Sequence, residues 1–244
     1  MGNVKSKFVL YLDIMGFKER VTKVDISKLE QQLREFRTKN DKLKPLLEKS
    51  NTNPPKIQIN MSQFSDSIVL VTEGGYLEDL NRICKAAAIL MQTGLETGFA
   101  LRGAMAKGEM IFDKENQLFF GKALVDAYLL EEELCYYGIV LHESMEDDVI
   151  KVQQSEKFYI VDTQNKKKYM PIEDVDVPLK KGKSKHYHIA WHKMNKKLEE
   201  GDMSDETIEW LRNMRKTVSG NPRVYLDNTI KMINDYKEKK TGVD

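Results

Sequence analysis

The chain has 244 residues, of which 41% are hydrophobic and 32% are charged, a profile typical of a soluble globular protein with a sizeable core. Its formal net charge of +1 gives no whole-chain argument for binding nucleic acid or an anionic membrane. No apolar run reaches the roughly 18 residues that cross a bilayer, so we expect a cytoplasmic protein without a membrane partner. Cys84 and Cys135 lack metal-ligand spacing, so we expect reduced thiols. We expect no nucleic acid partner either.

The first part of the chain alternates strand and helix patterns. The apolar run Phe8–Leu12 ends in Asp13 and predicts a buried strand with an acid at its exit. A helical pattern follows over 28–50, which Pro45 is expected to kink or end. Two further apolar runs, 56–63 and 67–73, flank the sequence FSDS and predict a β-hairpin with Asp66 at its tip.

The patterns continue in the same manner up to about residue 146. They predict a helix over 76–98, strands over 99–112 and 117–120, a helix over 121–135 and a strand over 138–143. This order predicts an α+β fold related to the ferredoxin-like palm, an antiparallel-rich sheet with helices on one face.

The remainder, 147–244, changes character and is predicted to be a C-terminal α/β extension. Its patterns indicate a polar hairpin over 157–173, a strand over 186–191 and two helices over 204–218 and 221–240. We expect 1–146 to form the main domain, with the extension either separate or part of the same domain and a candidate dimerisation element. His186, His188 and His192 are expected on a solvated strand face, because no further zinc ligand lies nearby.

Two aspartates carry the candidate chemistry. If the predicted hairpin lies beside the first strand, the carboxylates of Asp13 and Asp66 meet at one edge of the sheet. Mg²⁺ and Mn²⁺ prefer oxygen ligands, and Mg²⁺ is usually held by one or two carboxylates together with substrate phosphates. The pair therefore suits phosphoryl transfer, although each aspartate taken singly also suits a helix cap or a turn.

Four motifs, in order over about 7–143, resemble class III nucleotidyl cyclase domains. LDIMGF is similar to the family's F-x-D-[IVM]-x-G-F opening, and FSDSIVLV is similar to its second metal-aspartate hairpin. LRGAMAKGE is similar to the L-R-x-G-x-x-x-G-E strand, and FFGKALVDAYLLEEE to the W-G-x-x-V-N-x-A-x-R-L-E helix. The resemblance implies a homodimer that closes a 3′,5′-cyclic nucleotide and releases pyrophosphate.

Carried over by position, the resemblance makes Asp13 and Asp66 the ligands of two divalent metal ions, Mn²⁺ or Mg²⁺, with the Ile14 carbonyl completing one site. It also implies that backbone N–H groups of the turn after the first strand receive the triphosphate. The substrate contacts expected around these two turns are Ile14, Gly16, Phe17 and Ser65.

The departures from the family's pattern concern the base and the transition state. The positions at which purine cyclases read their base hold Ser62 and Leu118, and those of the family's ribose-binding Asn and catalytic Arg hold Val125 and Leu129. Tyr128 replaces a small family residue and is expected either to fill space beside a smaller base or to pack in the core.

The missing catalytic cation has two candidate replacements on the predicted strand 99–112. Arg102 and Lys107 point to opposite faces on strand alternation, so we expect at most one of them to reach the site, and Arg102 is the first choice. A surface ion pair is the alternative interpretation of Arg102.

The same departures resemble the pyrimidine cyclases of bacterial Pycsar anti-phage defence. That grouping implies a pyrimidine ribonucleoside triphosphate substrate, UTP or CTP, and a cyclic product that activates a separate effector. A purine cyclase that reads its base differently and a catalytically inactive nucleotide-binding homologue remain open. A palm polymerase or diguanylate cyclase is disfavoured, since no G-G-[DE]-[DE]-F sequence is present.

Overall fold

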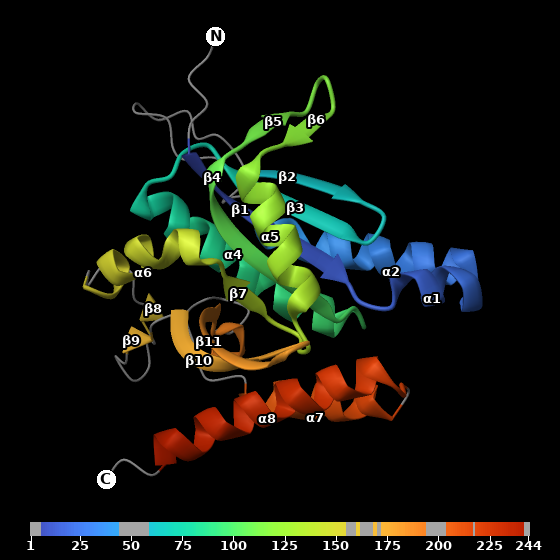
Figure 1. Ribbon diagram of the computed structural model, residues 1–244. Coiled ribbons are helices and arrows are strands. Elements are labelled where there is room, and N and C mark those ends of the chain that lie inside the picture. The colour runs from blue at the N-terminus through green and yellow to red at the C-terminus, as the bar shows by residue number, and fades with distance from the viewer. Residues whose placement is uncertain are drawn as a thin grey trace.

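The computed structural model describes residues 6–43, 59–154, 160–161, 168–169, 172–193, 204–216 and 218–241. Seven strands within these ranges form one sheet in the order β10-β11-β7-β4-β1-β3-β2 (Figure 1). The strands are β1 Ser6–Ile14, β2 Ile59–Phe64, β3 Ser67–Thr72, β4 Leu101–Glu109, β7 Ile139–Leu141, β10 Ile172–Leu179 and β11 Gly182–Ile189. The β4–β7 pair is parallel and the other pairs are antiparallel, which confirms the predicted antiparallel-rich α+β class.

β1 is an interior strand of this sheet. It pairs with β3 on one side and β4 on the other, so that Asp13 lies opposite both Ser67 and Arg102. Its alternate residues point to opposite faces. Leu10 and Leu12 are fully buried on one face, whereas Tyr11 and Asp13 are only partly buried on the other.

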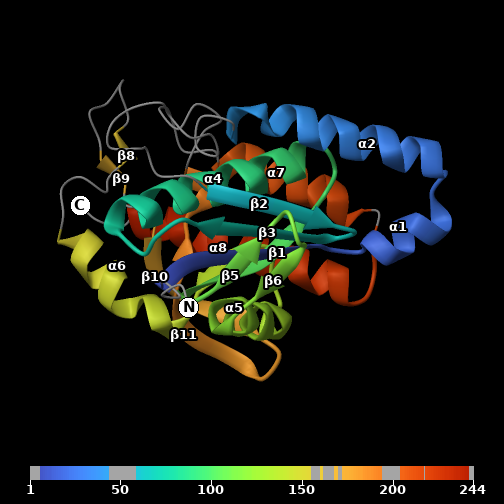
Figure 2. The ribbon, with the colours of Figure 1, turned by 90° about the horizontal axis from the view of Figure 1, so that it is seen from above.

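Helices pack against both faces of the sheet, so the prediction of helices on one face only is wrong. Leu10 and Leu12 belong to one large core with Leu80 of helix α4 Leu77–Glu96, and helix α2 Ile26–Lys39 joins the same core. On the other face, Val9 packs in a separate cluster with Ala123 of helix α5 Lys122–Glu133. Figure 2 shows α2 and α4 on one side of β1 and β3, and α5 on the other.

The predicted helix over 28–50 is shorter in the structure. α2 begins after Asp25, whose carboxylate accepts hydrogen bonds from the N–H groups of Ser27 and Lys28, and it gives way to a 3₁₀ turn at Asn40–Leu43. The helix therefore ends before Pro45, which lies outside the described residues. A short helix, α1 Phe17–Lys23, connects β1 with α2.

A two-stranded arm projects from the end of β4. Strands β5 Ile111–Asp113 and β6 Leu118–Phe120 pair with each other rather than with the main sheet. The rings of Phe112 and Phe119 pack with their centroids 4.6 Å apart and stiffen the arm. In Figure 1 the arm extends away from the body of the molecule beyond the start of α5.

The predicted boundary at 146/147 does not divide the sheet. Helix α6 Glu146–Gln153 begins at this boundary, and its Val149 and Val152 belong to the same core as β1. β11 pairs with β7, so the extension adds two strands to the main sheet. The sequence did not predict α6, although three acids in its first turn are a helix-start signal.

The extension ends in two helices, as predicted. These are α7 Ser204–Arg215 and α8 Asn221–Thr241, which lie side by side below the sheet in Figure 1. The small antiparallel pair β8 Ile160–Val161 and β9 Lys168–Tyr169 agrees with the polar hairpin predicted over 157–173, where that segment is described. Across the described parts of the chain, none of the helices combines the length and apolarity that a membrane crossing requires.

Candidate active site

The two predicted metal-binding aspartates lie together at one end of β1. Asp66 occupies the two-residue turn between β2 and β3, as predicted, and its backbone carbonyl accepts a hydrogen bond from the Ile14 N–H at 2.9 Å. This bond ties the hairpin tip to the residue that follows Asp13. Ser65, the other turn residue, has a left-handed φ of 55° and is exposed.

The electrostatics of Asp13 fit a cation at this place. Burial raises the pKa of Asp13 to about 6, the nearby Asp66 carboxylate contributes to this rise, and Arg102 opposes both effects. A carboxylate whose charged form is disfavoured by burial and by a neighbouring carboxylate is stabilised when a divalent cation binds it. The two carboxylates therefore suit Mg²⁺ or Mn²⁺ whose remaining ligands are substrate oxygens. The described residues contain no cluster of three or more His, Cys, Asp or Glu side chains that could hold a metal without substrate.

The turn after β1 offers fewer free N–H groups than the sequence suggests. The Ile14 N–H donates to Asp66, and the Met15 N–H donates to the Ala100 carbonyl at 2.9 Å. Among the described backbone hydrogen bonds, none uses the N–H of Gly16 or Phe17. Gly16 has a φ of 71°, a conformation that favours glycine and turns the chain into α1. Of the turn's residues, Gly16 and Phe17 are thus the ones with donors left for a phosphate.

Arg102 and Lys107 lie on opposite faces of the sheet, as strand alternation predicted. Arg102 is paired with Asp13 across the β1–β4 ladder and therefore shares its face. Lys107 is opposite Phe8, and its ammonium group pairs with Asp148 of α6 at 2.7 Å, above the Phe8 ring. Lys107 is not brought to the aspartates, whereas Arg102 is.

Arg102 is buried rather than a surface residue, and its partners are internal. Its Nε donates to Glu131 Oε1 at 2.5 Å and its Nη1 donates to the Leu134 carbonyl at 2.8 Å. The exposed fraction of Arg102 is 9%. The alternative interpretation is therefore right that Arg102 forms an ion pair and wrong that the pair lies at the surface.

Tyr128 lies over the same face as Asp13. Its ring meets the Tyr11 ring edge to face, with centroids 5.4 Å apart, and its hydroxyl donates to Glu132 at 3.0 Å. Tyr11 in turn shares a 2.8 Å hydrogen bond with Ser67, the residue after Asp66. Tyr128 is 40% exposed, so it borders the candidate site and is not a core residue.

Glu131 is the site residue that sequence reasoning missed. It is 2% exposed on α5, and burial raises its pKa to about 7, against the opposing effect of Arg102. In the sequence it is the first of three consecutive glutamates at a helix end, where a solvated face is the ordinary interpretation. The one available signal was its match to the last position of the family's helix motif.

Three of the four residues that depart from the cyclase motifs are exposed to solvent on the side of the site formed by α5 and the arm. Val125 and Leu129 are 53% and 54% exposed on α5, and Leu118 is 50% exposed on the arm. Ser62 pairs with Val69, which is itself opposite Tyr11, so Ser62 shares the face of Asp13. None of these four side chains carries a charge.

The predicted solvated face of histidines is wrong for two of the three. His188 and His192 are each 4% exposed, and only His186 is partly accessible. The Nε2 of His188 lies 3.8 Å from Glu173 Oε2, and the His192 ring packs against Tyr236 of α8. α8 covers this strand face, which the local pattern of the strand cannot reveal.

Comparison with known proteins gives similarity at the level of structure. Neither the family models nor the curated proteins contain a match to this chain. Among solved structures, it is similar to the guanylate cyclase domain of RhGC from Catenaria anguillulae in complex with GTP, at 14% identity and a TM-score of 0.49, over 77% of this chain and 97% of that one. It is also similar to a bacterial light-regulated adenylyl cyclase, at 10% identity and a TM-score of 0.49, over 86% and 97%. A third is the guanylyl cyclase Cya2, at 11% identity and a TM-score of 0.46, over 76% and 90%.

Proposed function

We propose that this protein is a nucleotidyl cyclase that converts a pyrimidine ribonucleoside triphosphate, UTP or CTP, to its 3′,5′-cyclic monophosphate and pyrophosphate. The observation that carries the proposal is the meeting of Asp13 and Asp66 at the end of β1, joined by the Ile14–Asp66 hydrogen bond. The order of the four sequence motifs supports it independently.

The residues of the site have distinct roles in this proposal. Asp13, Asp66 and the Ile14 carbonyl hold two divalent cations, which supply charge stabilisation at the reacting phosphate when bound. The N–H groups of Gly16 and Phe17 and the exposed Ser65 turn face the triphosphate. Arg102 lies opposite Asp13 in the sheet, but its guanidinium is bonded to Glu131 and the Leu134 carbonyl, so it borders the site without bonding to Asp13. Lys107, on the far face, has no part in the reaction.

The reaction closes a ring within one nucleotide. The ribose 3′-hydroxyl oxygen attacks the α-phosphorus, the bond from that phosphorus to the pyrophosphate oxygen breaks, and the hydroxyl proton is lost to solvent or base. Preference for a pyrimidine rests on Ser62 and Leu118, which lack the charged or acidic contacts of purine cyclases, and on Tyr128, which narrows the space beside Tyr11.

A nucleotide assay tests the proposal. Purified full-length protein is incubated with Mn²⁺ and each of ATP, GTP, UTP and CTP, and cyclic products are identified by mass spectrometry. We expect cyclic UMP or cyclic CMP from the wild type and none from Asp66→Ala. Preferential turnover of ATP or GTP would move the assignment to a purine cyclase, and no cyclic product from any nucleotide would overturn it.

A second candidate is a domain that binds a nucleotide without turning it over. It is favoured by the apolar, exposed Val125 and Leu129 at the positions of the family's Asn and Arg. Calorimetry separates the two candidates, because triphosphate binding that persists with Mn²⁺ and yields no pyrophosphate supports the binding domain alone.

We further propose that the site is completed in a homodimer. Large apolar side chains are exposed around the open side of the site on the hairpin tip, the arm and α5, namely Phe64, Leu118, Phe120, Val125, Tyr128 and Leu129. A gathering of this kind is typical of a protein–protein interface. Leu129→Glu should therefore yield a monomer in light scattering and lose turnover, whereas Ile150→Glu, on the exposed side of α6, should change neither.

The biological role proposed is that of a second-messenger producer in anti-phage defence, acting on a separate effector activated by the cyclic nucleotide. The support is the resemblance to the Pycsar grouping alone. Phage challenge of bacteria that express the protein should raise the level of cyclic UMP or cyclic CMP, and an unchanged level with active enzyme would remove this role while leaving the activity in place.

A further inference from the structure

One buried arginine joins three elements beside the candidate metal site. Arg102 of β4 donates to Glu131 of α5 and to the Leu134 carbonyl in the loop after α5. Its guanidinium also lies over the ring of Tyr225 of α8, 5.6 Å from the ring centroid. The C-terminal extension therefore reaches the residue directly opposite Asp13.

Arg102 has an alternative partner within reach. Cross-strand neighbours on one face of an antiparallel pair have Cβ atoms about 4.5–5.5 Å apart, and Asp13 and Arg102 are such neighbours. When the Cβ atoms of an arginine and an aspartate are this close, the guanidinium can reach the carboxylate and pair with it through two hydrogen bonds. In the structure the described hydrogen bonds of Arg102 go to Glu131 and Leu134 instead.

The two possible pairings of Arg102 have opposite consequences for a metal ion. An arginine bonded to Asp13 would occupy the carboxylate oxygens that a divalent cation needs and would place a positive charge beside that cation. An arginine bonded to Glu131 leaves the oxygens of Asp13 available to a metal ion. The negative charge of Glu131 also cancels much of the positive charge of the arginine.

We propose that Glu131 is a positioning residue of the metal site, which holds Arg102 away from Asp13 and so keeps that carboxylate available to divalent cations. This inference rests on the proposed function. Stability alone gives little reason for the pair, since a buried ion pair is often no more stabilising than apolar residues of similar size. Tyr225 assists by covering the guanidinium, which gives the C-terminal extension a part in the site.

Glu131→Gln tests the proposal in the full chain. The variant keeps the shape of the side chain but removes the charge that competes for Arg102. Mn²⁺ binding, measured by electron paramagnetic resonance in the presence of UTP, is expected to weaken by roughly tenfold. Turnover should fall at low Mn²⁺ and recover as Mn²⁺ is raised, so the change appears in the apparent KM for metal and not in kcat.

The neighbouring glutamate provides a matched control. Glu133 is on the same helix, is only partly buried, and undergoes the same chemical change in Glu133→Gln. That variant should bind Mn²⁺ as the wild type does. Should Glu131→Gln fail to fold, Glu131→Asp, which keeps the charge but shortens the reach to Arg102, is expected to weaken Mn²⁺ binding in the same direction by a smaller factor.

A double variant separates competition from a general loss of structure. Arg102→Leu combined with Glu131→Leu removes the competing cation together with its partner, so Mn²⁺ affinity should return to within about twofold of the wild type. Folded Glu131→Gln with unchanged Mn²⁺ affinity, or a double variant as weak as the single one, would overturn the inference while leaving the proposed cyclase intact. Absence of Mn²⁺ binding in the wild type would overturn both.

Discussion

Asp13 is a carboxylate in a place that disfavours its charge. It is partly buried on an interior strand of the sheet, it lies near a second carboxylate, and its pKa rises to about 6 as a result. A protein that gained nothing from this arrangement would be more stable without it. Functional sites commonly carry a cost of this kind.

Replacing Asp13 by asparagine should therefore separate stability from activity. The folded protein favours the protonated form of Asp13, so at pH 7 the ionised group destabilises it, and the neutral Asp13→Asn variant should be more stable by about 1 kcal/mol after allowance for solvent screening. Urea unfolding in EDTA measures this gain, which should disappear below about pH 4, where the aspartate is protonated in both states.

The same variant should lose at least about 100-fold in the proposed cyclase turnover, because it removes a proposed metal ligand. Asp113→Asn is the control. Hydrogen bonds from Asn116 lower the pKa of Asp113 at an exposed turn, so that variant should gain no stability. A loss of stability in Asp13→Asn would contradict the electrostatic interpretation.

Residues whose role is set by local sequence were predictable, and those whose role is set by distant packing were not. Asp13 and Asp66 each end or join a long apolar strand, so their places followed from pattern alone. Glu131 and His188 sit in polar stretches that look solvated. Arg102 pairs with Glu131, and His188 lies near His192, whose ring packs against Tyr236 of α8, and both contacts involve elements remote in the sequence. Burial of a polar group by a distant element leaves no local signal.

At the scale of elements, the close contact between β1 and β4 depends on one glycine. A Cβ at Gly103 would lie under 3.0 Å from the Tyr11 carbonyl oxygen and from Leu12 Cδ2, distances that real Cβ atoms do not adopt. This residue adjoins Arg102, and its lack of a side chain lets the two strands approach and sets Arg102 opposite Asp13.

Gly103→Ala should accordingly destabilise the protein by about 3 kcal/mol and lower turnover, because β4 must move away from β1. Thermal unfolding and the nucleotide assay measure the two effects. Gly108→Ala in the same strand is the control, since its Cβ would make ordinary contacts at 3.6 Å with Ala123. It should change stability by less than about 1 kcal/mol. Equal effects of the two substitutions would contradict the steric explanation.

Element types were more predictable than the layers that the elements form. The strand at β1, the β2–β3 hairpin, and helices α4, α5, α7 and α8 all followed from local patterns of apolar, turn and capping residues. The position of α5 on the face opposite α4 did not, because a helix pattern identifies an apolar stripe without saying which surface it covers. The end of α2 before Pro45 was missed for a related reason, since the apolar spacing continues beyond the last helical turn.

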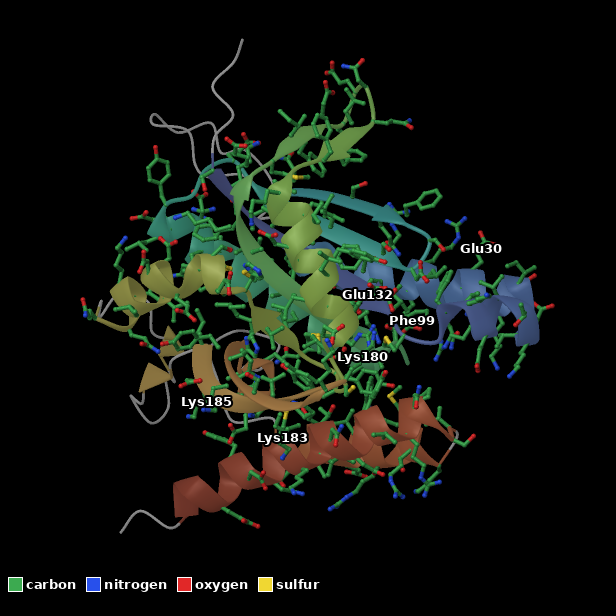
Figure 3. All side chains as sticks on the ribbon, in the orientation of Figure 1. Glu30, Phe99, Glu132, Lys180, Lys183 and Lys185 are labelled. Atoms are coloured by element: carbon green, nitrogen blue, oxygen red, sulfur yellow. The ribbon has the colours of Figure 1, made fainter. Side chains whose placement is uncertain are left out.

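At the scale of the whole molecule, the extension and the main domain share one sheet and one core. The sequence becomes more polar near residue 147. This change in polarity does not mark a structural boundary. Backbone contacts hold the extension in place near the end of α5. The Lys180 N–H donates to the Glu133 carbonyl at 2.9 Å, and Figure 3 labels Lys180 and the neighbouring Glu132 at this end of α5.

Glu173 of β10 is expected to make the stability of this region depend on pH. Burial alone would raise its pKa, but His188 and Lys193 lower it to about 2. The folded state thus favours the ionised form, so the contribution is fully present above about pH 4.5 and is lost as pH falls toward about 2. Because the Glu173 side chain is 27% exposed and therefore partly screened by solvent, we expect its ionised form to stabilise the fold by about 2 kcal/mol.

Glu173→Gln should remove that amount at pH 7 and nothing near pH 2, as measured by urea unfolding over this range. Asp174→Asn is the matched control on the next residue, where the exposed carboxylate lies 3.7 Å from Lys185. It should cost less than about 0.5 kcal/mol at any pH. A difference between wild type and Glu173→Gln that does not change with pH would contradict the prediction.

The interior position of β1 also determines how the site moves. Asp13 is carried by a strand that is hydrogen-bonded on both sides, so its backbone should exchange amide hydrogens only when the whole protein opens. Asp66 lies on a two-residue tip beside the exposed Ser65, held to β1 by a single backbone bond. The two carboxylates are therefore held unequally, one by a strand paired on both sides and the other by an exposed turn, so we expect faster amide exchange at Asp66 than at Asp13.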